Sequence, residues 1–375
     1  MNSAPVIVTI TALACTAIPA AALAQSRPAT ARDSARAVIA ATQAIAPGGI
    51  DELKAIEIGG IKQWINVRGN DPANPILLFI HGGPGSTMMP ESWTFQRPWE
   101  DFFTVVQWDQ RGAGKTFSAA GRLPDTTMTI DRMQADAEDV IQYLRRTYGR
   151  NKIFLMGHSW GSILGLRVAQ HHPEWLYAYI GVGQVVDGQL NEVVGYRQTL
   201  DRAEATGNDA AVKGLKALAP YPNPDGRTPL AKILAERHWD VALGGMLYGK
   251  TTSDDAAIQA MSPAYTDYDL VSARLGTMSS VKVLVPQLAS VSFTNDTVFK
   301  CPVFFFAGAQ DRTTPESLVE SYFQRIQAPE KKFFRIERAA HYVVNEAPGE
   351  VLLDLVRDIR PLARGGDAGG GDHAR

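Results

Sequence analysis

The chain has 375 residues, of which 37 are basic and 39 acidic, so its net charge is −2 at pH 7. A charge this close to neutral excludes the strong positive field that attracts nucleic acids or anionic lipids, and we expect neither as a partner. A single hydrophobic core usually extends over no more than about 250 to 300 residues. We therefore expect one large core that carries an inserted segment.

Residues 1–24 have the composition of a secretory signal peptide. Pro5 to Ala24 carry no charge, and Ala22-Leu23-Ala24 forms a small-residue cleavage site before Gln25, although the first four residues contain no Lys or Arg. A transmembrane anchor is the alternative, but Pro19 interrupts the apolar run and no charged cluster directly follows it. We expect an exported protein, periplasmic or secreted, with no stable membrane insertion after cleavage.

The chain from residue 25 to residue 185 alternates apolar runs with helical patterns. Glu57 to Val67 predicts an antiparallel hairpin that turns at Gly59-Gly60. The alternation that follows is typical of an α/β fold, with a mostly parallel sheet flanked by helices on both faces. The predicted strands of this half are Pro75–Ile80, Phe103–Trp108, Lys152–Met156 and Tyr177–Val182.

Two of these strands lead into distinctive loops. His81-Gly82-Gly83-Pro84-Gly85 follows the first, and its glycines allow the backbone to approach a substrate closely. Asp109-Gln110-Arg111 follows the second, and we expect a buried Asp109–Arg111 pair that shapes the loop. Gly112 to Thr116 imitates a phosphate-binding loop, but Asp109 stands where that motif requires its first glycine. We predict no nucleotide site.

Gly157-His158-Ser159-Trp160-Gly161 lies between the strand Lys152–Met156 and a helical pattern from Ser162 to His171. A Gly-x-Ser-x-Gly at such a junction is typical of a nucleophile elbow, a sharp and strained turn that exposes the serine hydroxyl. The glycines are needed because a side chain two residues from the serine would collide with the neighbouring strand or helix. Ser159 is therefore the predicted nucleophile.

Residues 186–300 are predicted to form a helical cap inserted into the core. This stretch is far longer than a minimal connection between two parallel strands, and a segment at this place would cover Ser159. Its predicted helices are Leu190–Thr206, Asp209–Leu218 and Leu230–Leu247, followed by a looser tract.

The core resumes at residues 301–364, where Cys301–Ala307 and Lys332–Ile336 are the predicted strands. Asp311 lies in the loop after the first of them. His341 is the one of seven histidines that lies in a late loop after a strand, where a catalytic base is expected. Asp269 or Asp296 could replace Asp311 as the partner of His341 if the insertion folds differently. Cys301 should be a small buried side chain, and the Gly-rich residues 365–375 should be disordered.

These residue types fit one chemistry. A serine hydroxyl needs a base within hydrogen-bond reach to take its proton, and an imidazole titrates near neutral pH. A carboxylate such as Asp311 would fix the tautomer of the His341 ring and stabilise its charged form. The backbone N–H groups of Gly83 and Trp160 would bind the oxygen on which negative charge develops. We predict Ser159, Asp311 and His341 as catalytic residues.

Three motifs together resemble the proline iminopeptidase (prolyl aminopeptidase) branch of the α/β-hydrolase fold: His81 to Gly85, Asp109 to Gly114 and Gly157 to Ser162. The resemblance extends from about Pro75 to Pro173 and returns from Cys301 to Pro348. It implies a serine exopeptidase that removes an N-terminal residue, often proline, with Ser159, Asp311 and His341 as the triad and Gly83 and Trp160 as the oxyanion hole.

The chain departs from the family pattern at three places. His158 precedes the serine, where the family usually has glycine. Ala340 precedes the histidine, where the family often has glycine. Gly308-Ala309-Gln310-Asp311 replaces the common Gly-Arg-Tyr-Asp. These departures concern prolyl specificity, since esterases and other amidases share the motifs.

An aminopeptidase needs cap carboxylates for the substrate's ammonium and an apolar slot for its first side chain. We predict Glu204, Glu236, Trp239 and Tyr248 as substrate-binding residues; the alternative is that they are solvated helix faces or cap core. The candidate carboxylates are Glu192, Asp201, Glu204, Glu236, Asp240, Asp267 and Asp269, and the apolar candidates are Trp160, Trp239, Tyr248 and Phe293.

The predicted function is that of an exported serine hydrolase that uses an acyl-enzyme and neither metal nor organic cofactor. Its predicted substrates are short peptides, from which it releases the N-terminal residue. The alternative is an esterase or lactonase with the same triad. A third hypothesis is a binding protein that keeps the hydrolase frame without catalysis, and the oligomeric state is not predicted.

Overall fold

The computed structural model describes residues 30–251 and 255–363. The predicted signal peptide (1–24) and tail (365–375) lie outside the described residues. Eight strands form one sheet, in the order β1-β2-β4-β3-β5-β6-β7-β8. They are β1 (Ile50–Ile58), β2 (Ile61–Gly69), β3 (Ile76–Ile80), β4 (Thr104–Asp109), β5 (Ile153–His158), β6 (Leu176–Val182), β7 (Val303–Gly308) and β8 (Lys331–Ile336).

The sheet is mostly parallel. β1 and β2 form the predicted antiparallel hairpin, which begins earlier than predicted, and β2 joins β4 in antiparallel fashion. All the remaining neighbours are parallel. Every residue of β3 to β7 is buried, as expected where helices cover both faces, whereas β1 and β8 are partly exposed edge strands. The predicted α/β-hydrolase architecture is confirmed.

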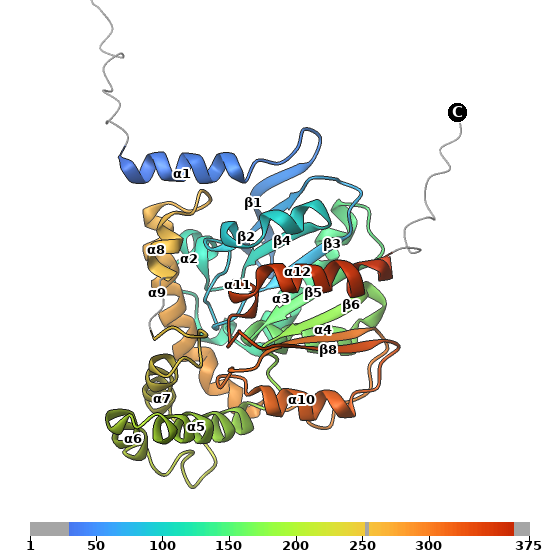
Figure 1. The fold of residues 1–375 in the computed structure, drawn as a ribbon. Coiled ribbons are helices and arrows are strands. Elements are labelled where there is room, and N and C mark those ends of the chain that lie inside the picture. The colour runs from blue at the N-terminus through green and yellow to red at the C-terminus, as the bar shows by residue number, and fades with distance from the viewer. Residues whose placement is uncertain (1–29, 252–254, 364–375) are drawn as a thin grey trace, which may run out of the picture.

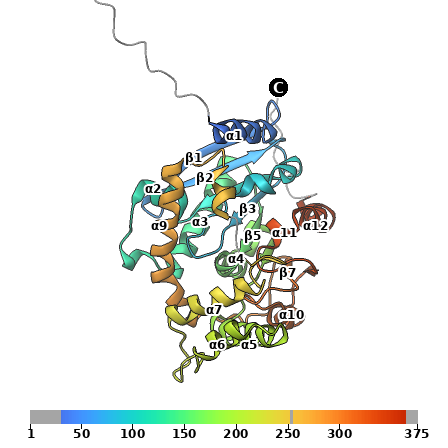
Figure 2. The same cartoon turned by 60° about the vertical axis from the view of Figure 1, so that its left-hand side comes forward.

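The alternation of side chains along β3 divides the core into two layers. Leu78 and Ile80 contribute to one layer with α3, α4 and α10, while Leu77 and Phe79 contribute to the other with α11 and α12. Figures 1 and 2 show these helices on the two sides of the sheet. The helices of this part are α2 (Gly114–Ala120), α3 (Ile130–Thr147), α4 (Trp160–His171), α10 (Glu316–Arg325), α11 (Val343–Glu346) and α12 (Pro348–Asp354).

The chain between β6 and β7 forms a group of helices beside the sheet (Figure 1). The first three, α5, α6 and α7, contact one another, and a 3₁₀ segment, η5 (Val285–Ser290), leads back toward β7. The bounds are α5 (Gly188–Ala205), α6 (Asp209–Lys216), α7 (Leu230–Ala242), α8 (Asp255–Ala260) and α9 (Asp267–Leu284). The first two match the predicted helices closely, while α7 ends before the predicted Leu247.

The looser tract predicted after residue 247 is wrong for residues 267–284, which form the 18-residue helix α9. Thr266 begins the helix with a capping box, because its hydroxyl accepts from the Asp269 N–H and Asp269 accepts from the Thr266 N–H. The buried face of α9 carries Ser272, Ala273, Gly276 and Ser280 and packs against α2. A buried face of small residues gives no apolar periodicity, which is why the sequence pattern missed this helix.

Helix α1 (Ala31–Thr42) buries none of its residues and lies across α8 (Figure 1). It is held by two arginines. Arg32 forms an ion pair with Asp267 (2.5 Å) and donates to the Ala260 carbonyl (3.0 Å), while Arg36 donates to the Tyr265 carbonyl. Within residues 30–251 and 255–363, none of the helices combines the length and apolar character needed to cross a bilayer.

The contact between α9 and α2 can be tested at Gly276. A Cβ at this position would lie 2.7 Å from the Gly112 carbonyl oxygen and 2.9 Å from the Phe117 ring. We expect Gly276→Ala to lower the free energy of unfolding by about 1–3 kcal/mol, measured by urea unfolding. Gly349→Ala in α12 is the control, since a Cβ there meets nothing within 4 Å. Equal stabilities of the two variants would contradict the close packing of α9.

Candidate active site

Ser159 occupies the turn between β5 and α4 in a strained conformation. Its φ of +52° is the one positive value among the described residues other than glycine. Its N–H donates to the Val182 carbonyl of β6 (3.0 Å). A Cβ on Gly157 would lie 2.6 Å from the Gly161 carbonyl oxygen, and one on Gly161 would overlap the Ile80 carbonyl oxygen. The turn therefore has the geometry predicted for a nucleophile elbow.

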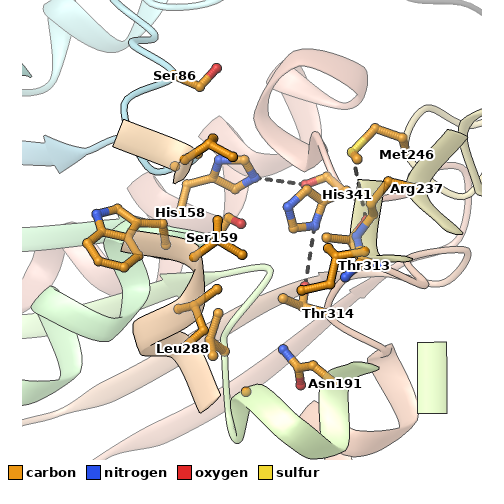
Figure 3. A pocket seen from close by; sticks show the side chains of 18 of the residues that line it. Ser86, His158, Ser159, Asn191, Arg237, Met246, Leu288, Thr313, Thr314 and His341 are labelled. Carbon is orange, nitrogen blue, oxygen red and sulfur yellow. Dashed lines mark hydrogen bonds between the residues drawn. The ribbon is translucent and has the colours of Figure 1, made fainter. Parts of the chain in front are cut away.

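His341 and Asp311 form a buried pair. The His341 Nδ1 donates to Asp311 Oδ2 over 2.8 Å, and Thr314 Oγ donates to the same oxygen over 2.7 Å. The other carboxylate oxygen accepts from the N–H groups of Thr313 and Thr314, each over 2.9 Å. Figure 3 shows the His341 ring beside the Ser159 hydroxyl. The three side chains that the sequence singled out therefore lie together.

Asp311 stays charged despite its burial. Burial raises the pKa of its carboxyl group, but the charge of His341 and the hydrogen bonds from His341 and Thr314 outweigh burial and hold the pKa below its usual value. The two alternative acids lie elsewhere. Asp269 forms an ion pair with Lys115 (2.7 Å), and the carbonyl of Asp296 accepts from Tyr322 Oη (2.6 Å).

The loop after β3 faces Ser159. A Cβ on Gly82 would lie 3.1 Å from the Ser159 Cβ, so this glycine permits the close approach. Gln110 holds the two segments together, because its Nε2 donates to the His81 carbonyl (2.8 Å) and its Oε1 accepts from Trp160 Nε1 (3.2 Å). Gly83 and Trp160, the two predicted oxyanion-hole residues, line the same cavity as Ser159.

The predicted Asp109–Arg111 pair does not form. Arg111 instead donates to Asp136 of α3 (2.7 Å) and to the Gly59 carbonyl (2.7 Å). Asp109 accepts from the Lys115 N–H (2.7 Å) and from the hydroxyls of Thr87 and Tyr265. β4 ends at Asp109, so Arg111 lies beyond the strand in the following turn, from which its guanidinium reaches Asp136 of α3 and the Gly59 carbonyl. Burial raises the pKa of Asp109.

A cavity of about 200 Å³ opens above Ser159. Its core side is formed by the Gly82-Gly83 turn, His158 and His341, and its cap side comes from α5, α7 and η5 (Figure 3). The cap contributes apolar side chains and three polar ones. The cap residues are Asn191, Glu192, Leu230, Ile233, Leu234, Arg237, Met246, Val281, Val285 and Leu288.

None of the four cap residues predicted to bind substrate lines this cavity. Glu204 is exposed and pairs with Lys216 (2.8 Å). Trp239 packs between α6 and α5, against Gly214. Tyr248 is exposed and bonds through its N–H to Glu346, while Glu236 is fully buried behind Arg237. Helical periodicity alone did not show which face of each cap helix meets the core.

The cap wall instead presents Asn191 and Glu192. Glu192 accepts from Arg237 (2.6 Å) and from the Tyr221 hydroxyl. Asn191 is buried, and within the described chain no donor lies within hydrogen-bond distance of its Oδ1. The sequence signal for this face is the spacing of Gly188, Glu192 and Gly195, because the two glycines let α5 pack closely, Gly188 against the Leu288 carbonyl of η5 and Gly195 against the Arg312 carbonyl.

Three carboxylates share two guanidinium groups behind this wall. Arg237 contacts Glu192 and Glu236, and Arg312 donates to Asp240 (3.0 Å). Burial raises the pKa of Glu236 and of Asp240. When all five groups are ionised, three carboxylates against two guanidinium groups leave one negative charge, and of these side chains only Glu192 and Arg237 line the cavity. Metal binding has no comparable basis in residues 30–251 and 255–363, where no three His, Cys, Asp or Glu side chains are grouped to hold an ion.

The profile of the alpha/beta hydrolase fold family matches residues 75–348. The chain belongs to this family. This α/β-hydrolase is 32% identical to the probable aminopeptidase YbaC of Bacillus subtilis over 311 residues, which cover 82% of this chain and 96% of that protein. The proline iminopeptidase of Neisseria gonorrhoeae is 41% identical over 119 residues, which cover 32% of this chain and 36% of that protein.

Solved structures share the fold of this α/β-hydrolase at low identity. The proline iminopeptidase of Mycobacterium smegmatis matches with a TM-score of 0.58 and 18% identity, covering 83% of this chain and 98% of that chain. A thermophilic esterase from Thermogutta terrifontis matches with a TM-score of 0.55 and 18% identity, covering 83% and 99%. The predicted resemblance to proline iminopeptidases is confirmed at the level of the family.

A second buried carboxyl group lies behind the His341 loop. Glu91 accepts from Gln259 Nε2 (2.6 Å) and from Asn345 Nδ2 (3.4 Å) and interacts electrostatically with Tyr342, next to His341. Burial raises the pKa of Glu91 to about 7, and the nearby charge of Asp255 adds to the rise. Glu91 therefore holds a proton in the folded chain at mildly acidic pH.

This proton makes stability depend on pH. Between the ordinary Glu pKa of 4.5 and about 7, the folded chain keeps a proton on Glu91 that the unfolded chain has released. The free energy of unfolding should then fall as the pH rises through this window, by up to about 3 kcal/mol. Glu91→Gln should remove the fall, because the amide cannot ionise. Urea unfolding at pH 5 and pH 8 measures this difference in the free energy of unfolding. An equal difference in wild type and variant would refute the assignment.

Proposed function

We propose that this α/β-hydrolase is a serine hydrolase that releases N-terminal residues from short peptides. The observation that carries the proposal is the meeting of Ser159 and His341 in one cavity, with Asp311 bound to His341 and the Glu192 carboxylate on the cap wall. The core side supplies chemistry for an amide or ester, and the cap side supplies acceptors for an ammonium group.

The proposed reaction begins when His341 Nε2 takes the proton of the Ser159 hydroxyl as Ser159 Oγ attacks the substrate carbonyl. Asp311 holds the ring through Nδ1, so that Nε2 is free to act as the base, and stabilises the imidazolium. The imidazolium then donates the proton to the leaving amine, and the carbon–nitrogen bond breaks. Water, activated by the same His341, hydrolyses the resulting acyl-enzyme.

Negative charge on the substrate oxygen would be stabilised by the backbone N–H groups of Gly83 and Trp160. Both residues line the cavity, and Trp160 begins α4, whose N-terminal dipole also favours negative charge. Removal of one such donor typically costs about 3 kcal/mol of transition-state stabilisation.

The ammonium group of the substrate would bind at Glu192, which lines the cavity beside Asn191. The cluster that contains Glu192 has one carboxylate more than it has guanidinium groups. A bound ammonium would compensate that charge. The names of the relatives in Bacillus and Neisseria point the same way, whereas the esterase from Thermogutta keeps ester hydrolysis as the second candidate.

We further propose that the hydrolase is exported through its residues 1–24, whose composition fits a signal peptide. Sequencing the N-terminus of protein recovered from its native host tests this, and a mature chain that begins at Gln25 is the expected result.

Substrate class is tested by kcat/KM for prolyl and alanyl p-nitroanilides, their N-acetylated forms and p-nitrophenyl butyrate. We expect turnover of the free aminoacyl anilides and a loss on acetylation, because acetylation removes the positive charge. Ser159→Ala should abolish all turnover. Hydrolysis of the ester alone would establish the esterase alternative and exclude the peptidase.

The ammonium site is tested by Glu192→Gln. We expect kcat/KM for free aminoacyl anilides to fall by roughly 10- to 100-fold, because a charge-assisted hydrogen bond is lost. The rate with p-nitrophenyl butyrate should change little. Glu204→Gln is the matched control, since Glu204 lies on the same helix but faces solvent. An equal loss on both substrates would indicate a structural role for Glu192 instead.

A further inference from the structure

His158, the residue before Ser159, contacts the backbone of His341. Its Nε2 lies 2.9 Å from the His341 carbonyl oxygen, and its ring centroid lies 4.9 Å from that of His341 and 5.5 Å from that of Tyr342. His158 is 2% exposed and lines the cavity, and Figure 3 shows its ring above Ser159 and directed at His341.

The hydrogen bond fixes the tautomer of His158. A carbonyl oxygen can only accept, so Nε2 must carry the hydrogen and Nδ1 the lone pair. Within the described chain, no partner lies within reach of Nδ1, which is buried. A second proton would therefore be a buried donor without an acceptor. Burial and the charge of the adjacent His341 lower the pKa of His158 to about 3, so this ring is neutral near neutral pH.

Two other contacts hold the same stretch of chain from the opposite side. The His341 N–H donates to the Met246 carbonyl (3.2 Å), and Glu346 accepts from the Ala340 N–H (2.8 Å). The first contact comes from the cap, and the second comes from Glu346 at the end of α11, just after His341. The bond from His158 arises from the elbow, so it links the position of the histidine directly to the residue that carries the serine hydroxyl.

We propose that His158 is a positioning residue, which sets the distance between His341 and Ser159 by donating to the His341 carbonyl. This rests on the proposed function, in which His341 takes the proton of Ser159. A displacement of about 1 Å between such groups can cost roughly 100-fold in rate, so a contact of this kind acts on kcat.

The test compares His158→Gln with His158→Asn. The Gln amide nitrogen can reach the place of Nε2 and donate to the His341 carbonyl, whereas the Asn amide reaches only the place of Nδ1. Both variants replace the imidazole ring with an uncharged amide, so both lose the ring contacts with His341 and Tyr342. We expect Gln to keep kcat for p-nitrophenyl butyrate and alanyl p-nitroanilide within about fivefold of wild type, and Asn to lower it roughly 10- to 100-fold, with KM nearly unchanged in both.

Thermal unfolding of the two variants separates positioning from folding. Similar melting temperatures with different kcat values would support the proposal. Equal kcat values in the Gln and Asn variants would overturn it, as would a loss that appears only in KM. Wild-type enzyme with no turnover and no fluorophosphonate labelling of Ser159 would instead refute the proposed function. His158→Leu gives a second comparison, and a kcat within twofold of wild type would also overturn the proposal.

Discussion

The close approach of α4 to the end of β3 is the constraint on which the rest of the site depends. Gly161 leaves no room for a side chain beside the Ile80 carbonyl, and Gly157 leaves none beside Gly161. This contact forces the positive φ of Ser159 and brings the Gly82-Gly83 turn against it. The strain is maintained by a sheet whose central strands are buried on both faces, so the local cost is offset by the packing of the whole core.

The loops that carry His341 and Asp311 are attached to the cap as well as to the sheet. Arg312, next to Asp311, pairs with Asp240 of α7, and the His341 N–H donates to the Met246 carbonyl that follows α7. Arg237 and Glu192, which line the cavity, therefore belong to the same group of cap side chains that borders the loops of Asp311 and His341. A change in the cap would reach the chemistry through the positions of these loops.

The sheet, the elbow and the Ser159, Asp311 and His341 positions could be predicted because each follows from a local pattern. Buried strands read as apolar runs, and the elbow needs glycines at fixed places. The cap could not be read in the same way. Helix α9 buries Ser272, Ala273 and Gly276. Asn191 and Glu192 meet the cavity because α5 packs through Gly188 on η5 and through Gly195 on the Arg312 carbonyl. Likewise, no local rule pairs Arg111 with Asp136 in preference to Asp109, since that choice depends on how α3 packs.

Cys301 lies just before β7 with 2% of its surface exposed, and burial raises the pKa of its thiol to about 11. Thiol reagents react with the thiolate. The Cys301 side chain is therefore protected both because reagents cannot reach it and because it stays protonated. A cysteine placed on the outer face of the cap, at solvent-exposed Glu204 for example, would react with a fluorescent maleimide well before Cys301. In the chain without residues 1–24, and therefore without Cys15, the buried thiol leaves the folded enzyme open to site-specific labelling, through which movements of the cap during turnover could be followed by spectroscopy.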